Sequence, residues 1–166
     1  MDIYVPDRQE LNSIKKPAKV KGNRWGFCGI AAMSAAIGIA PLKICDSIPD
    51  WPGYTPSRML IETLAKFGYD CRRILIPKLE QQMWPLYQAG HPSKIAIGRI
   101  YWSEGKYADS HWICFNWSME SLDDPYPGLY DNTFYDGWWD TRHLKFYIEN
   151  RTAKLKSLYF VIKGEK

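Results

Sequence analysis

Residues 28–39, CGIAAMSAAIGI, form the stretch of the chain that decides its fold. Nearly every residue in this stretch is small or apolar, and none is charged. A helix that is apolar on all sides is buried inside a protein, and Pro41 predicts where this one ends. We therefore expect a buried helix that begins at Cys28, with small residues such as Gly29 and Ala31 that let other elements pack close.

Helical patterns come first along the chain, and strand patterns follow. Residues 57–67, SRMLIETLAKF, predict an amphipathic helix with Ser57 at its N-cap and Gly68 just past its end. Residues 1–22 are expected to be an irregular lead-in, and residues 46–57 a turn-rich loop. The later segments predict strands at 69–76, 95–102, 111–117 and 157–163, and short helices at 79–88 and 141–149. This order predicts an α+β fold in which N-terminal helices pack on an antiparallel sheet.

The size and composition indicate one globular domain spanning residues 1–166. Hydrophobic residues make up 46% of the chain and charged residues 24%, which excludes a disordered protein. No apolar run approaches the roughly 20 residues of a membrane span, and the N-terminus lacks the apolar centre of a signal peptide. We therefore expect a cytoplasmic protein that does not bind membranes.

The positive charge is modest and is concentrated in two places. The chain has 22 basic and 18 acidic residues, a net charge of +4. Residues 151–166 alone supply that excess, and a second basic run lies within residues 15–24. These patches are smaller than the electrostatic footprint of a nucleic-acid-binding protein. We expect solvated surfaces there, and no nucleic-acid partner.

The four cysteines are Cys28, Cys45, Cys71 and Cys114, and no two of them are closely spaced. Neither a zinc knuckle nor a small disulfide scaffold fits this spacing. No metal and no cofactor are expected, and the cysteines are expected to be free thiols.

Cys28 is the cysteine whose position favours chemistry. A thiol at the start of a helix meets the positive end of the helix dipole and unbonded N–H groups. Such a position can lower a thiol pKa from about 8.5 to between about 3.5 and 7.5. The plainer interpretation is a buried structural cysteine, which is common in apolar helices.

His111 and Asp124 are candidate partners of that thiol. His111 begins the clearest strand pattern, HWICFNW, in which it alternates with Trp112 and Cys114 on the other face. A hairpin running from His111 would bring Asp124 beside the imidazole, where a carboxylate orients the ring. Asp123 competes for that role. The plainer interpretations are a strand-end histidine with one hydrogen bond and a turn aspartate before proline.

Taken together, a cysteine at a helix start, a later histidine at a strand start and an Asp-Pro pair resemble papain-like cysteine peptidases. The pattern is most similar to the bacteriocin-processing, double-glycine leader peptidase family and its stand-alone relatives. The matching segments are CGIAAMSAAIGI, the helix ending in KFGY, QAGHPSKIAIG, SHWICF and DDPYPG, within about residues 20–130. The resemblance implies cleavage of a peptide or isopeptide bond in a protein or peptide through Cys28, His111, Asp124 and an acyl-enzyme.

The sequence departs from that family at the oxyanion hole. The family carries a Gln six positions before the nucleophile, and this chain has Gly22 there. Asn23 is the nearest amide and would serve with the Cys28 backbone N–H if the turn shifts by one residue. Losing one oxyanion donor costs about 10²–10³ in rate, so this departure also favours a weakened or inactive enzyme. Trp25 and Trp112 are candidate walls of a substrate groove. The aromatic-rich segment 126–139 is expected to form a lid or groove edge.

Two other functions fit the same residues. Transglutaminase-like enzymes share the order Cys, His, Asp, so acyl transfer or Gln deamidation by the same triad is an alternative to hydrolysis. A catalytically inert papain-like binding module is the other, and Gly22 favours it.

Overall fold

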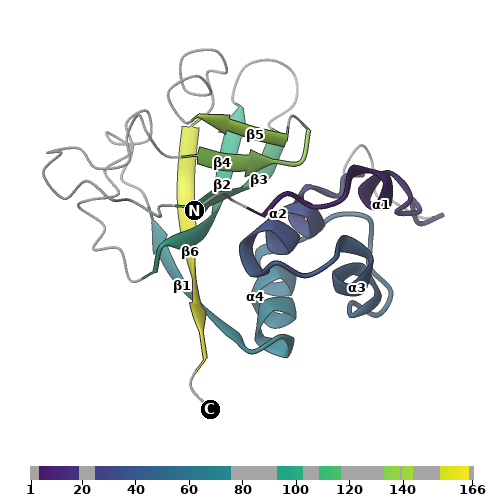
Figure 1. Cartoon of the computed structure of the whole chain (residues 1–166), viewed down its shortest axis with the longest axis horizontal. Coiled ribbons are helices and arrows are strands. Elements are labelled where there is room, and N and C mark those ends of the chain that lie inside the picture. The colour runs from purple at the N-terminus through teal and green to yellow at the C-terminus, as the bar shows by residue number, and fades with distance from the viewer. Residues whose placement is uncertain are drawn as a thin grey trace, which may run out of the picture.

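A computed structural model describes residues 4–18, 25–75, 93–102, 109–116, 133–138, 140–143 and 154–164. Its strands form a six-stranded sheet in the order β1-β6-β2-β3-β4-β5, with antiparallel neighbours throughout. The helices gather on one side of this sheet (Figure 1). The predicted α+β architecture, with helices first and an antiparallel sheet after them, is confirmed.

The described helices are α1 (Arg8–Asn12), α2 (Cys28–Ile37), α3 (Pro41–Asp46) and α4 (Ser57–Lys66). Helix α2 ends earlier than predicted, because Gly38 takes up a left-handed conformation with φ 69° and its N–H bonds back to the Ser34 carbonyl. Pro41 does not end that helix; it begins the next one, α3, where its missing N–H costs nothing.

The strands are β1 (Tyr69–Leu75), β2 (Ile95–Trp102), β3 (Asp109–Asn116), β4 (Thr133–Asp136), β5 (Asp140–His143) and β6 (Lys154–Lys163). Four of them match the predicted strands to within a few residues. The last strand along the chain, β6, lies inside the sheet between β1 and β2.

Several predicted segments differ from the structure. Helix α1 lies within the expected lead-in, because Asp7 caps it by accepting from the N–H groups of Gln9 and Glu10. Residues 133–136 of the expected lid form β4, and residues 140–143, which overlap the predicted helix 141–149, form β5. Pairing of β4 with β3 and of β5 with β4 decides these two strands, and a local pattern does not reveal such pairing. The predicted helix at 79–88 lies outside the described residues.

Ser57 is the first residue of α4 rather than its cap, and Pro56 holds the N-cap position without a side-chain hydrogen bond. The Ser57 hydroxyl instead accepts a hydrogen bond from Arg99 of β2, at 3.2 Å. Gly68 does lie just past the end of the helix, with φ 88°.

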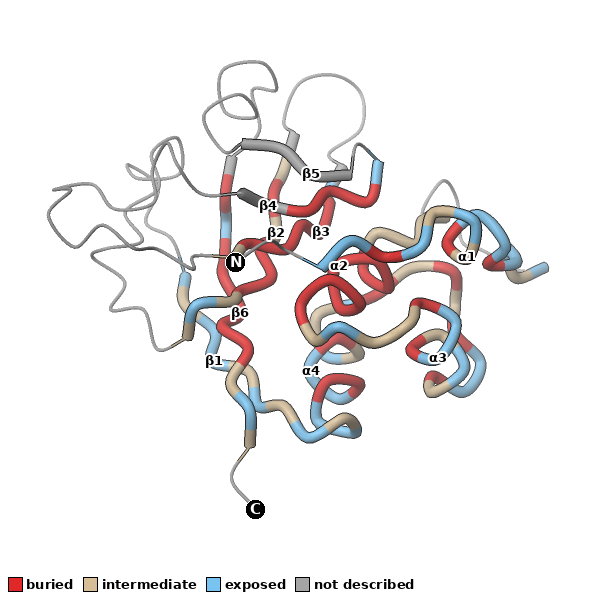
Figure 2. The backbone as a smooth tube through the Cα atoms, viewed as in Figure 1, coloured by how far each residue is buried: buried red, intermediate tan, exposed pale blue. Residues whose placement is uncertain are grey.

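Helix α2 lies at the centre of the core. All its residues from Gly29 to Ala36 are buried, as the red tube of Figure 2 shows. It packs on the sheet through side chains of one face of the strands, which include Ile97, Trp112, Cys114, Tyr135 and Tyr159. The alternating residues Ile113, Phe115 and Phe160 are fully buried as well. The expected alternation along β3 is therefore present, with both faces shielded from water.

No helix within the described parts of the chain combines the length and the apolar character that a membrane crossing requires.

Gly29 is a point of close approach between α2 and the loop before α4. A Cβ at this position would lie 2.4 Å from the Cβ and the Oγ1 of Thr55, which is itself buried. The absence of a side chain at Gly29 therefore sets the distance between the start of α2 and the Thr55 backbone.

We expect Gly29→Ala to lower the free energy of unfolding by about 1–3 kcal/mol, the usual effect of an overpacked core. Urea denaturation measures this loss. Gly26→Ala is the matched control, since a Cβ there meets no atom within 4 Å. Equal stability of the two variants would contradict the close approach.

Candidate active site

The thiol of Cys28 lies at the first residue of α2, half-buried where the helix meets the sheet. Phe27 occupies the N-cap and gives no side-chain hydrogen bond, and the first backbone bond of the helix runs from the Ala31 N–H to the Phe27 carbonyl. The first N–H groups of a helix have no intrahelical acceptor. The thiol thus sits beside backbone donors and the positive end of the helix dipole.

The imidazole of His111 lies between this thiol and a carboxylate. His111 is on β3 and fully buried, and its Nε2 is 2.9 Å from Oδ1 of the equally buried Asp136. The imidazole also lies close enough to the Cys28 thiol for its charge to lower the pKa of that thiol. Cys28, His111 and Asp136 therefore form one chain of polar contacts inside the protein.

The register of β3 and β4 explains why Asp136 reaches the ring. Ile113 pairs with Asp136 in this antiparallel ladder, so His111 faces position 138 and Asp136 is its diagonal neighbour on the same face. The Trp138 indole does lie on the imidazole, with ring centroids 4.0 Å apart and planes 20° from parallel. The backbone N–H of Trp138 also donates a hydrogen bond to Asp136 Oδ1, at 2.9 Å. This bond orients the carboxylate.

The pKa values of the thiol and the ring shift toward a charged pair. Burial by itself raises the pKa of Cys28, but the charge and hydrogen bond of His111 and a hydrogen bond from the Trp112 backbone bring it below its usual value. Burial lowers the pKa of His111, but Cys28 and Asp136 together raise it to about 9. Between these two pKa values the pair is a thiolate and an imidazolium.

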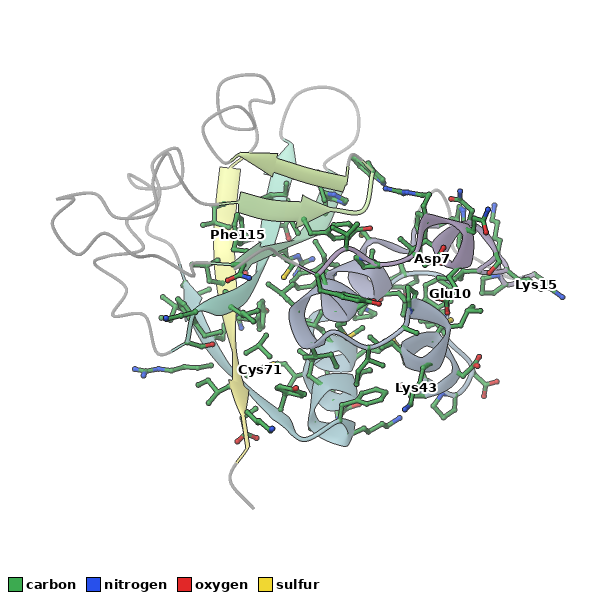
Figure 3. The ribbon with its side chains drawn as sticks, viewed as in Figure 1. Asp7, Glu10, Lys15, Lys43, Cys71 and Phe115 are labelled. Carbon is green, nitrogen blue, oxygen red and sulfur yellow. The ribbon has the colours of Figure 1, made fainter. Side chains whose placement is uncertain are left out.

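The other three cysteines shift the opposite way. Burial and the neighbouring Asp46 raise the pKa of Cys45, and burial and Asp70 raise that of Cys71 to about 11. Burial raises the pKa of Cys114 further. Cys71 lies on β1, as Figure 3 shows, and no imidazole among the described residues shifts its pKa.

Trp112, predicted as a groove wall, is a core residue that braces the site. Only 5% of its surface is exposed, and its indole N–H donates to the Thr55 carbonyl at 2.8 Å. The Arg99 guanidinium lies 5.6 Å from the centre of the Trp112 ring, and it also donates a hydrogen bond to the Ser57 hydroxyl. These contacts tie β3, whose backbone reaches Cys28, to the loop before α4. Among the described residues they leave little of the indole exposed to a substrate groove.

Trp25 is half-buried, packs against the core and lies three residues before Cys28 in the sequence. Its ring meets Trp51 edge-on at 5.6 Å, and the next residue, Gly26, donates its N–H to the Gly53 carbonyl at 2.8 Å. A contact of Trp25 with substrate stays a prediction. Gly22 and Asn23 lie outside the described residues, so the proposed oxyanion donor Asn23 is a prediction as well.

Asp124 and its competitor Asp123 also lie outside the described residues. Asp124 was predicted to lie beside the imidazole, and in the structure the carboxylate at His111 Nε2 is that of Asp136. The returning strand of the hairpin begins at Thr133, so the connection is longer than the predicted turn. The Asp136–Gly137 pair was the available signal, because Asp-Gly between two short strands is typical of a hairpin turn.

No cluster of three or more His, Cys, Asp or Glu side chains that could hold a metal ion occurs within the described ranges.

Comparison with known proteins adds one finding at the level of the fold. No family model matches the chain, and no curated protein matches its sequence. Among solved structures, the peptidase domain of Streptococcus ComA, a bi-functional ABC transporter involved in a quorum-sensing pathway, matches with a TM-score of 0.55. The two share 13% sequence identity over 86% of this chain and 93% of that domain.

This chain has the papain-like cysteine peptidase fold. The predicted fold is therefore confirmed, and the predicted likeness to leader peptidases is confirmed for the fold alone. In this chain the start of helix α2 meets the antiparallel sheet at Cys28 and His111.

Selective alkylation tests the charge pair. We expect iodoacetamide to modify Cys28 near neutral pH while Cys45, Cys71 and Cys114 react little, since only Cys28 has a lowered pKa. Mass spectrometry of the digested protein gives the rate at each cysteine. His111→Ala removes the imidazolium and should raise the pH at which Cys28 begins to react. Equal rates at all four sites would contradict the pair.

Replacing Asp136 tests the carboxylate. Asp136→Asn should lower the pKa of His111 from about 9, because the hydrogen bond and the negative charge of Asp136 both raise it. The ring signals of His111 in an NMR pH titration report this pKa. Asp124→Asn is the matched control and should leave the titration unchanged. A shift in Asp124→Asn without one in Asp136→Asn would reverse the assignment.

Proposed function

We propose that this chain is a cysteine-dependent hydrolase that cleaves a peptide or isopeptide bond, with Cys28 as nucleophile, His111 as acid and base, and Asp136 as the group that orients His111. The observation that carries the proposal is the buried contact chain from Cys28 through His111 to Asp136, together with the opposite pKa shifts of thiol and ring. A thiolate held ready near neutral pH is what nucleophilic attack on an amide requires.

The first half of the reaction forms an acyl-enzyme. The Cys28 thiolate attacks the substrate carbonyl carbon, and the electrons of the C=O bond move to its oxygen. The His111 imidazolium then gives its proton to the leaving amine nitrogen as the C–N bond breaks and the carbonyl re-forms. This leaves a thioester on Cys28 and a neutral imidazole, which Asp136 keeps in the required orientation.

The second half of the reaction releases the acid. A water molecule gives a proton to His111 as its oxygen attacks the thioester carbon. The C–S bond then breaks, which restores the thiolate of Cys28 and the imidazolium of His111. In both halves the oxyanion would lie near the Cys28 backbone N–H at the uncapped start of α2. Asn23 is the proposed second donor.

The buried charges favour an active site over an inert binding module. Burying ionised groups is unfavourable unless they are paired. Replacing a whole buried ion pair with well-packed apolar residues often stabilises a protein. Strongly shifted pKa values accordingly cluster at functional sites. A module that only binds a partner has no use for a lowered thiol pKa next to a raised histidine pKa.

Hydrolysis and acyl transfer use the same acyl-enzyme and differ in the acceptor, which is water or an amine. Transfer and deamidation would act on a Gln side chain, whereas the proposed hydrolase acts on a bond between residues. The substrate in each case is a protein or peptide.

Labelled peptide mixtures that include isopeptide-linked pairs test the proposal. With wild-type protein we expect new peptide termini, detected by mass spectrometry, and a transient thioester on Cys28 trapped by acid quench. Cys28→Ala should lose both, while Cys45→Ala, the control, should keep both. Incorporation of an added amine without new termini would instead identify acyl transfer. Peptide capture by Cys28→Ala and wild type alike, with no turnover, would identify a binding module.

A further inference from the structure

The turn after Asp136 connects the carboxylate, the indole on His111 and the nucleophile helix. Asp136 and Trp138 both contact the ring of His111, and Gly137 lies between them in sequence. Gly137 is buried against α2, where an added Cβ would lie 3.1 Å from the Cβ of Ala31 and 3.8 Å from the Cα of Cys28. A displacement of this one residue would therefore move both partners of the imidazole.

The carbonyl of Gly137 is held by a side chain from the opposite end of the chain. The Arg8 guanidinium of α1 donates a hydrogen bond from Nη1 to this oxygen, across 129 positions of sequence. In Figure 1 the tip of the β4–β5 hairpin points toward α1. The turn is thus held between α2 on one side and Arg8 on the other.

The segment that carries Arg8 is itself well anchored. Leu11 and Ile14 are buried in the core that includes α2 and α3. Glu10 accepts a hydrogen bond from the Leu42 N–H of α3 at 3.4 Å, and Asp7 caps α1, as the labelled side chains of Figure 3 help to locate. The backbone of Arg8 is therefore held in place, and its side chain extends from there to the Asp136–Trp138 turn.

We propose that Arg8 is a positioning residue of the active site, which fixes the Asp136–Trp138 turn and through it the orientation of His111. This inference goes beyond the proposed reaction, because it makes the N-terminal segment a part of the site. Arg8 touches neither the substrate nor the ring nitrogens in this role. Its effect is geometric: it keeps Asp136 Oδ1 in line with His111 Nε2.

Loss of the hydrogen bond between Arg8 and Gly137 would shift the pKa values of His111 and Cys28 in known directions. Asp136 raises the pKa of His111, so a loosened turn lowers it from about 9. A less protonated ring stabilises the thiolate less, so the pKa of Cys28 rises. The pH range in which thiolate and imidazolium coexist therefore narrows from both sides. A variant that is merely less stable reduces the folded fraction without moving either pKa.

The test compares Arg8→Met, which keeps an unbranched apolar side chain, with Arg8→Lys, which keeps a donor. Arg58→Met is the control, because Arg58 is an exposed arginine whose ion pair within the described part of the chain is with Glu62 of its own helix. Cys28 alkylation against pH gives the pKa of the thiol, NMR titration gives that of His111, and urea denaturation reports stability. None of the readouts needs a substrate, so they are independent of which bond the protein cleaves.

In Arg8→Met we expect both pKa values to move toward each other by about half to one unit, since contacts of this kind shift a pKa by about one to three units. Arg8→Lys should lie between this variant and wild type, and Arg58→Met should match wild type. Coincident titrations in wild type and Arg8→Met, whatever the stability, would overturn the role of Arg8 alone. An unshifted Cys28 in the wild type would overturn the charge pair, and with it this inference.

Discussion

The hydrogen bond between Asp136 and His111 is the interaction on which the site depends. It joins two side chains that water does not reach, so the carboxylate is compensated within the protein by the imidazolium and by the Trp138 N–H. Removing one partner of such a pair leaves an uncompensated buried charge, which is far more unfavourable than losing a surface ion pair. The surrounding structure must therefore hold both side chains within a narrow range of positions.

The supports for this bond come from distant parts of the sequence. Arg8 holds the turn after Asp136 from the N-terminal segment, and Thr55 holds the strand of His111 through the Trp112 indole. Gly29 allows the Thr55 loop to lie against helix α2, which begins at Cys28. The site is therefore not a local motif on one hairpin but the meeting point of several segments, each of which also contributes to the hydrophobic core.

The parts of this arrangement that follow local patterns could be predicted from the sequence. The apolar run after Cys28 indicated the buried helix, and the alternation after His111 indicated a strand, so both ends of the thiol–imidazole contact were anticipated. Asp136 was missed because its place depends on the register between β3 and β4, which a one-dimensional pattern does not contain. Short helices such as α1 also escape prediction, because tertiary contacts stabilise them more than their own propensity does.

The place of β6 in the sheet has a consequence for how the protein is made. This strand lies between β1 and β2, so neither has its full set of backbone partners until synthesis has passed Lys163. Cys28 emerges early, followed much later by its histidine and carboxylate. A nascent polypeptide that has not yet reached β3 and β4 therefore carries an ordinary cysteine, because His111 is what brings the pKa of Cys28 down. The lowered pKa is a property of the assembled sheet and helix together, and the helix acquires it only on folding.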